Sequence, residues 1–236
     1  MNHIKKSCVR ITRPLYIAII LALCISSCKR RGDKFIDQGE IHYNIDYKGS
    51  FAYPTETLPK DLIVSFKNDK ILFEMTGLAN SGIMNLSNPE LGIFDTYYNF
   101  FGVKKYYYSG KSGEIFPGFE AMKGIQINKT SRVQKICGYD CKNAEVTFEN
   151  DRNKVYNIWY TDEIEVVNPN ASTPFSQIDG VLMSFFFIMG QSELHFMCET
   201  VYSKDLSDNI FQRKPNYLRV SKPDMVELMD DMLKTD

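Results

Sequence analysis

The sequence predicts a mainly β fold: a curved antiparallel sheet, or incomplete β-barrel, with a few helices that include one near the C-terminus. Three observations lead to this prediction. Apolar and polar side chains alternate along several short segments, which is the period of a half-buried strand. Clusters of Gly, Pro, Asn and Asp separate those segments, as expected for hairpin turns. Aromatic residues make up 13% of the chain, and aromatic side chains favour strands over helices.

The first half of the predicted sheet begins at Gly39, where apolar and polar side chains alternate strictly up to Asp46. A loop with one glycine and two prolines follows over 48–60. The pair Asn68-Asp69 then marks the turn of a hairpin. The apolar face of the first strand carries Ile41, Tyr43, Ile45 and Tyr47. Further strands are expected at 62–66, 71–75, 83–86, 91–98 and 106–108.

A hairpin lies at the centre of the sequence, behind the turn that contains Gly138. Glycine supplies the positive φ that a tight hairpin needs. The expected strands are 130–136, a segment ending at 149, and 154–161, with a turn at 150–153. The preceding stretch, 109–127, holds five Gly or Pro residues and is the least regular part of the chain, with a helical turn expected near 119–122.

The last third of the chain predicts another hairpin and a helix. Residues 181–189 are almost continuously apolar, which is too short for a membrane-spanning helix and favours a strand buried on both faces. A partner strand, with Cys198 on its apolar face, follows Gly190. Pro223 opens a helix with apolar residues at helical spacing: Met225, Leu228, Met229 and Met232. A sheet of about ten strands tends to curl, so we expect loops or helices over its concave side.

Residues 1–28 have the features of a leader: four basic residues, the apolar run 15–25, and the ending Ile-Ser-Ser-Cys28. The apolar run is too short to be a settled membrane span. The ending resembles the lipobox of bacterial lipoproteins, which implies cleavage and lipidation of Cys28. The alternatives are an ordinary signal peptide or a membrane anchor. We therefore expect a signal peptide at 1–28, a polar tether at 29–38, and one β-rich half-barrel domain at 39–236.

Removing the leader changes the formal charge from −1 to −5. The mature domain is mildly acidic and lacks the basic stripe typical of nucleic-acid binding. We therefore expect contact with a membrane through the lipid anchor and no nucleic-acid partner. No acidic residue stands directly after Cys28, and among bacterial lipoproteins this favours the outer membrane, with the protein facing the periplasm.

Besides the lipidated Cys28, three cysteines remain after cleavage, which is an odd number. Cysteine usage of this kind fits an oxidising compartment. Cys137 and Cys141 bracket the central turn, so a local disulfide between them is expected, with Cys198 pairing with either as the alternative. A metal site would need more ligands than this pair, and no His lies nearby in the sequence. We expect neither a metal nor a cofactor.

Several stretches resemble an uncharacterised family of bacterial envelope proteins. They are the opening Gly39-Glu-Ile-His-Tyr, the central Ile136-Cys-Gly-Tyr-Asp-Cys-Lys-Asn-Ala, and Tyr156-Asn-Ile-Trp-Tyr-Thr after it. The resemblance covers about 39–217. That family is similar to the LolA/LppX group of lipoprotein carriers, and the resemblance implies an incomplete β-barrel with helices in its mouth and an apolar cargo.

Catalytic motifs are absent from the sequence: there is no nucleophile elbow, zinc-protease motif, phosphate loop or dinucleotide fingerprint. After cleavage only His42 and His195 remain, both on polar strand faces. Asp162, Glu163 and Glu165 would be an acid–base set, but carboxylates at the end of a strand are usually solvated. We therefore expect no enzymatic activity.

Aromatic residues form the one constellation that suggests binding, because ligand sites are concave and mostly apolar. They would line the concave face for an acyl chain or another hydrophobic ligand; the alternative is a packed core. In that second case the protein would dock an envelope protein through an exposed edge or loop such as 109–127. The candidate lining residues are Tyr43, Tyr47, Phe66, Phe73, Tyr106, Tyr108, Trp159, Phe185, Phe187 and Phe196.

Overall fold

The computed structural model describes residues 36–49 and 54–232. The predicted signal peptide, the lipidation site Cys28 and most of the predicted tether lie outside the described residues. The end of that tether does not: Ile36 is buried in the core, and Gln38 begins the first strand. The folded part therefore starts slightly before the predicted boundary at residue 39.

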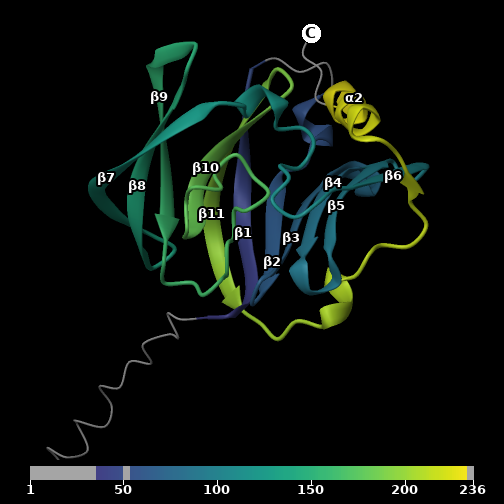
Figure 1. The fold of residues 1–236 in the computed structure, drawn as a ribbon, viewed down its shortest axis with the longest axis horizontal. Helices are drawn as coiled ribbons and strands as arrows, with labels where there is room; N and C mark the ends of the chain where they lie inside the picture. Colours follow the sequence, from purple (N-terminus) through teal and green to yellow (C-terminus); the bar gives the residue numbers. More distant parts are fainter. Residues whose placement is uncertain (1–35, 50–53, 233–236) are drawn as a thin grey trace, which may run out of the picture. The chain divides into compact units, whose positions relative to one another are not determined.

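Twelve strands of the described chain form one sheet, in the order β12-β6-β5-β4-β3-β2-β1-β11-β10-β9-β8-β7 (Figure 1). All pairings are antiparallel except the parallel pair β12–β6. The mainly β, mostly antiparallel prediction is therefore confirmed. The strands are β1 (Gln38–Lys48), β2 (Asp61–Lys67), β3 (Lys70–Thr76), β4 (Gly82–Asn88), β5 (Ile93–Phe100), β6 (Lys104–Ser109), β7 (Ile125–Ile136), β8 (Tyr139–Phe148), β9 (Asp151–Thr161), β10 (Val181–Met189), β11 (Ser192–Ser203) and β12 (Leu218–Arg219).

Within residues 36–49 and 54–232 the helical elements are few and short, apart from α2 (Lys222–Met232). The five 3₁₀ turns are η1 (Thr55–Thr57), η2 (Leu78–Asn80), η3 (Pro89–Leu91), η4 (Glu120–Met122) and η5 (Asp208–Phe211). The predicted helical turn near residues 119–122 corresponds to η4. No helix among the described residues is long and apolar enough to cross a membrane.

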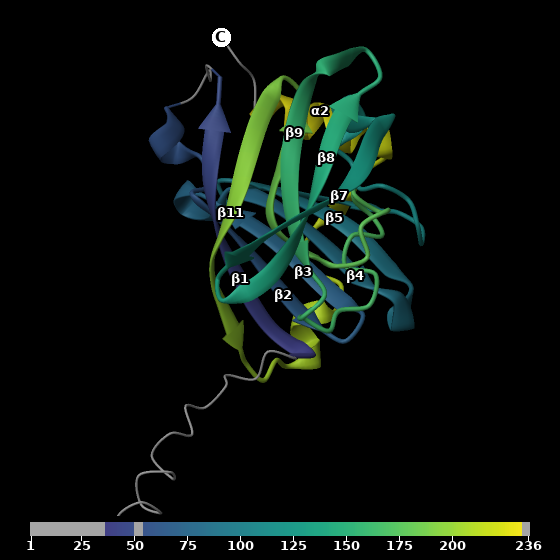
Figure 2. The ribbon, with the colours of Figure 1, turned by 90° about the vertical axis from the view of Figure 1, so that its left-hand side faces the viewer.

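β1 joins the two halves of the sheet, because it pairs with β2 on one side and with β11 on the other (Figure 2). Its alternating side chains place Ile41 and Tyr43 in the core. The pairing with β11 also explains Gly39, since a Cβ atom at this position would lie 2.1 Å from the carbonyl oxygen of Tyr202. Only glycine permits that approach of the two backbones.

Two loops cover the concave, apolar face of the sheet. The loop between β6 and β7 buries Phe116, Phe119 and Met122, and the loop between β9 and β10 buries Phe175 and Ile178. Segment 109–127 was one candidate for an exposed docking loop; its Phe116, Phe119 and Met122 close the core, while Lys111, Ile115 and Lys123 stay exposed. Its last residues also belong to β7, which begins at Ile125 rather than at 130.

β10 is buried on both faces, as its continuous apolar sequence predicts: Phe185 and Phe186 are 3% and 1% exposed. The loop residue Phe175 lies 5.8 Å from Phe186 and 6.5 Å from Phe185 between ring centroids. β10 pairs with β9 over only three residue pairs, the last of them Ser184 with Trp159. Beyond this point β9 is no longer paired with β10, although it stays paired with β8.

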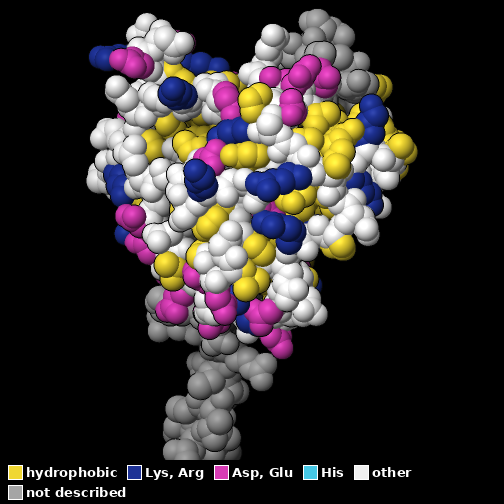
Figure 3. All heavy atoms as spheres, turned by 45° about the vertical axis from the view of Figure 1, so that its right-hand side comes forward, with side chains coloured by type: hydrophobic (Ala, Val, Ile, Leu, Met, Phe, Trp, Pro, Cys, Tyr) yellow, Lys and Arg dark blue, Asp and Glu magenta, His cyan; other side chains and the backbone are white. Residues whose placement is uncertain are grey.

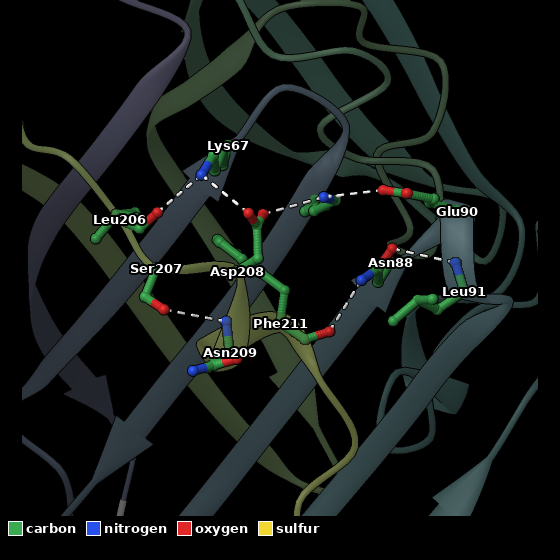
Figure 4. Close-up of polar contacts among 10 residues, drawn as sticks. Lys67, Asn88, Glu90, Leu91, Leu206, Ser207, Asp208, Asn209 and Phe211 are labelled. Carbon is green, nitrogen blue, oxygen red and sulfur yellow. Dashed lines mark hydrogen bonds and ion pairs between the residues drawn. The ribbon is translucent and has the colours of Figure 1, made fainter.

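The C-terminal segment 204–219 forms a strap across the outer face of the sheet, which the sequence did not predict. The strap and the strands beneath it share a second apolar cluster, and Figure 4 shows the polar contacts at its margin. Lys67 donates to the carbonyl of Leu206 (2.9 Å) and Asn88 donates to that of Phe211 (3.0 Å). The buried members of the cluster are Leu72, Leu86, Ile93, Tyr97, Leu206 and Phe211.

A buried carboxylate fixes the second half of the strap. Asp95, on β5, is fully buried and accepts two hydrogen bonds from the Arg213 guanidinium, at 2.7 and 3.1 Å. The hydroxyl of Tyr97 donates to the same carboxylate (2.9 Å) and accepts from the backbone N–H of Lys214 (3.0 Å). A charge that is buried and paired in this way is costly to uncover, so the strap is a firm part of the fold.

Helix α2 follows the strap and confirms the predicted C-terminal helix. Ser221 precedes it, and its hydroxyl donates to Asp224 Oδ2 (2.6 Å) while the N–H of Asp224 points back to Ser221 (3.4 Å). This is capping chemistry at a helix start. Met225 and Met229 are buried, and the Met229 methyl would lie 2.4 Å from a Cβ at Gly118, so the helix packs directly on the β6–β7 loop.

Candidate functional site

The concave face of the sheet carries nine of the ten aromatic residues expected to line a ligand site. Cross-strand partners share a face. In one half of the sheet Phe187 lies opposite Leu194, and in the other half Tyr108 lies opposite Thr96. β1 connects the two halves through its own pairings, so residues from both halves lie on this face. The nine are Tyr43, Tyr47, Phe66, Phe73, Tyr106, Tyr108, Phe185, Phe187 and Phe196.

Trp159 is the exception. It lies opposite Asn143 on β8 and Ser184 on β10, whereas its neighbours Ile158 and Tyr160 are buried in the core. Because successive side chains of a strand point to opposite faces, Trp159 lies on the outer face. The expectation that it lines the concave pocket is therefore wrong.

The rings of the concave face pack against one another. Phe185 is stacked on Phe196 with centroids 4.8 Å apart and meets the edge of Phe187 at 5.2 Å. Tyr43 meets Phe185 edge-on at 5.4 Å, and its hydroxyl donates to the carbonyl of Leu182 (2.7 Å). Burial raises the pKa of Tyr43 well above its ordinary value. Such geometry is typical of a packed core.

The two covering loops complete this packing. Phe119 lies over Phe187 with centroids 4.4 Å apart, and Phe175 is stacked on the same ring at 5.9 Å. The loops are also joined to each other, because the N–H of Phe116 donates to the carbonyl of Ser172 (3.0 Å). They therefore act as one cover, made largely of aromatic side chains that sequence reasoning had not assigned to the site.

Little space remains beneath the cover. Two voids of about 20 Å³ each lie on the concave face, one lined by Phe116 and Phe119 and the other by Val166 and Pro169. A volume of this size holds about one water molecule, whereas ligand pockets measure about 300–1,000 Å³. Phe73 lines both voids and is only half-buried. These two voids on the concave face are thus far smaller than a ligand pocket, and the Phe73 ring lies between them.

The three cysteines also meet at this face, but not as the local pairing predicted. Cys137 Sγ lies 2.7 Å from Cys198 Sγ, while Cys141 Sγ points to the carbonyl oxygen of Tyr139 at 3.6 Å. All three are free thiols. The structure thus places Cys137 against Cys198 instead of Cys141, in line with the alternative pairing. No group of three or more His, Cys, Asp or Glu side chains within 36–49 and 54–232 could hold a metal ion.

A polar cluster that the sequence did not reveal lies where β9 leaves β10. Glu193 accepts hydrogen bonds from Lys154 (2.9 Å) and Tyr156 (2.8 Å) of β9 and contacts His195 at 2.5 Å. Burial alone would raise the pKa of Glu193, but hydrogen bonds from Lys154, His195 and Tyr156 outweigh it and lower that pKa to about 2. The cluster bridges β9 and β11 and has the form of a structural link.

The other predicted polar residues are placed apart. His42 lies on the outer face beside Tyr202, with ring centroids 5.0 Å apart. Asp162 pairs with Lys142, and Glu163 accepts from the backbone N–H of Asp140 (2.9 Å). These carboxylates bind neighbouring strands, so the structure does not gather an acid–base set at the end of β9.

Apolar side chains on the surface are scattered among Lys and Arg, as Figure 3 shows for one face. The β5–β6 turn carries two of them close together, Phe101 at 43% and Val103 at 84% exposed. Phe101 has φ +49° and Gly102 φ +73°, and the N–H of Val103 donates to the carbonyl of Phe100 (3.0 Å). This geometry is that of a type I′ turn, whose first position favours Asn.

No protein-family model and no curated protein matches the sequence. Among solved structures, two crystal forms of PNGF-II are similar, with TM-scores of 0.50 and 0.49 and 16% identity. The match covers 82% and 80% of this chain but 33% and 32% of PNGF-II, so the chain spans about a third of that protein's length. At this identity the likeness concerns the fold alone.

More distant structural similarity is found to two mycobacterial proteins. The Mycobacterium tuberculosis lipoprotein LppX matches with a TM-score of 0.31 and 8% identity, over 83% of this chain and 99% of LppX. LprF from Mycobacterium bovis matches with a TM-score of 0.29 and 12% identity, over 72% and 88% of the two chains. The envelope family suggested by the sequence motifs stays a prediction.

Proposed function

We propose that this chain is a lipid-anchored, non-catalytic protein of the cell envelope that docks an envelope protein through an exposed turn. One observation favours docking over carriage of a lipid: the chain's own rings pack the concave face, and the two voids there measure about 20 Å³ each. The proposed location rests on the leader and on Cys28, which would anchor the protein in the outer membrane, facing the periplasm.

The β5–β6 turn is the docking element in this proposal. A bulky side chain at positive φ is a costly backbone state, worth on the order of 1–3 kcal/mol, and Phe101 nevertheless leaves much of its ring in solvent. Lys104, the first residue of β6, follows the turn directly and is exposed. The partner is therefore an envelope protein that offers an apolar recess rimmed by carboxylates.

The edges of the sheet are less suited to docking. β7 is a long edge strand, but it carries Lys129, Arg132 and Lys135, and its pairing with β8 is interrupted by a bulge after Lys129. Charges and bulges of this kind discourage the addition of a further strand. At the other edge, the short β12 lies parallel to β6. The turn, by contrast, carries Val103, the most exposed large apolar side chain among the described residues at 84%.

Replacing Phe101 with asparagine tests the proposal because it separates stability from binding. Asparagine fits the first position of a type I′ turn, so the melting temperature is expected to rise by about 2–3 °C while partner recovery falls. Partners would be captured by cross-linking in intact envelopes on the lipidated protein. Leu91→Asn is the matched control, since Leu91 is 56% exposed in another turn and should leave recovery unchanged. Equal capture by wild type and Phe101→Asn would rule out this turn as the docking element.

Binding of a hydrophobic ligand in the concave face is the second candidate function. The observation that favours it is Phe73, a half-buried ring that lines both voids; its displacement would join them. Phe73→Ala is expected to increase the fluorescence of an apolar dye at least several-fold, with displacement by fatty acid. Phe148→Ala, at the margin of the core and away from both voids, is the control. A stoichiometric lipid on the wild-type protein in native mass spectrometry would favour this function over docking.

A further inference from the structure

The thiol contact of Cys137 and Cys198 joins two distant parts of the chain. The two residues are 61 positions apart, and Cys137 Sγ also donates to the carbonyl oxygen of Cys198 at 3.1 Å. Cys137 lies in the turn between β7 and β8, whereas Cys198 lies in β11 opposite Tyr43. In the sheet order, β10 and β9 separate β11 from β8. The contact therefore links strands that share no backbone hydrogen bonds.

The backbone around Cys137 indicates that the sulfur itself matters. Cys137 has φ +51° and Gly138 φ +86°, the pattern of a turn whose first position favours asparagine. A cysteine in this state is strained by its backbone. Its side chain is only partly buried, whereas Cys198 is 5% exposed. One partner is thus open to reagents and the other is held in the core beside it.

We propose that Cys137 and Cys198 form a disulfide, with Cys141 left as a buried free thiol. The proposal relies on the proposed envelope location for its oxidant, a dithiol oxidase in its disulfide form. The Cys137 thiolate attacks one sulfur of that disulfide, and the other sulfur leaves as a thiolate. Cys198 then displaces the oxidant's sulfur from Cys137. The pair loses two protons and two electrons in total, and the oxidant becomes a dithiol.

The environment of each thiol fits this order of events. Burial, followed by the hydrogen bond with Cys137, raises the pKa of Cys198 above its ordinary value, and burial raises that of Cys141 to about 11. Thiols with raised pKa values are poor nucleophiles at neutral pH, so the more exposed Cys137 begins the exchange. Cys198 reacts second because Cys137 holds its sulfur at contact distance.

Peptide mapping of the lipidated protein from envelopes tests the pairing. Free thiols would be alkylated before lysis and again after denaturation, without reduction. A linked pair of peptides containing Cys137 and Cys198 is expected, with alkylation at Cys141 only. Closing a loop of this length implies that reduction lowers the melting temperature by about 10 °C. A Cys137–Cys141 link would overturn the proposal.

Two variants and one oxidation in vitro complete the test. Cys141→Ala should retain the linked peptides, while Cys137→Asn, which suits the turn, should fold without a link and lose the effect of reduction on melting. Three free thiols in cells, but the Cys137–Cys198 link after incubation with glutathione disulfide, would support the pairing and contradict the envelope location. Three free thiols under both conditions would overturn the pairing itself.

Discussion

Replacing Phe211 with alanine is expected to lower the free energy of unfolding by about 3–5 kcal/mol. Phe211 is fully buried in the cluster between the strap and the outer face of the sheet, so removing its ring leaves a cavity beneath a segment that has few other apolar anchors. The melting temperature should fall by roughly 10 °C. Urea unfolding followed by circular dichroism measures the change.

Leu218→Ala is the control for this prediction, because Leu218 belongs to the same strap but is 65% exposed. Exposed positions usually change stability by less than about 0.5 kcal/mol. If Phe211→Ala behaved like the control, the strap would be a loosely held tail, contrary to its hydrogen bonds from Asn88 and Lys67. Backbone contacts are kept in both variants, so the comparison isolates the buried ring.

Glu193→Gln is expected to cost about 2–3 kcal/mol at pH 7. The pKa of Glu193 falls from an ordinary value of 4.5 to about 2, which corresponds to about 3 kcal/mol by linkage. Glutamine keeps the shape but loses the charge that Lys154 and His195 bind. The loss should appear in urea unfolding as a lower midpoint with an unchanged slope.

The pH dependence of this effect follows from the direction of the shift. A carboxyl whose folded pKa is lowered stabilises the fold fully above its unfolded pKa, near 4.5, and loses that contribution as the pH falls to about 2. Wild type and Glu193→Gln should therefore differ at pH 7 and converge near pH 2. Glu199→Gln, on an exposed position of the same strand, should follow the wild-type profile. A difference between Glu193→Gln and wild type that persisted at pH 2 would contradict the assignment to this charge.

Local patterns predicted the parts of the fold that depend on neighbours in sequence. Alternation in β1 and the continuous apolar run of β10 identified strands and their buried faces. The helical spacing of Met225 and Met229 identified α2. Alternation also held a signal for Trp159: Tyr156, Ile158 and Tyr160 are the buried positions, so the residue between the last two belongs to the other face. Trp159 had been assigned to the concave pocket because it is aromatic, and not because of its place in the alternation.

Features that depend on distant contacts were not accessible from sequence. The strap lies over β3–β5 because of pairs such as Asp95 with Arg213, which are separated by 118 positions. The β6–β7 loop reads as irregular, yet Phe116 and Phe119 fill the concave face. Whether aromatic residues line a pocket or a core depends on what covers them, and the cover comes from segments with no periodic pattern.

The pairing of β1 with β11 has a consequence for how the molecule is made. β1 pairs with β11, which lies about 150 residues later in the chain. Such long-range pairing is slow to form. During synthesis the amino-terminal hairpins can assemble, but the halves of the sheet cannot unite until residue 203 has emerged. The two halves of the sheet are therefore expected to join late, after the hairpins within each half have formed.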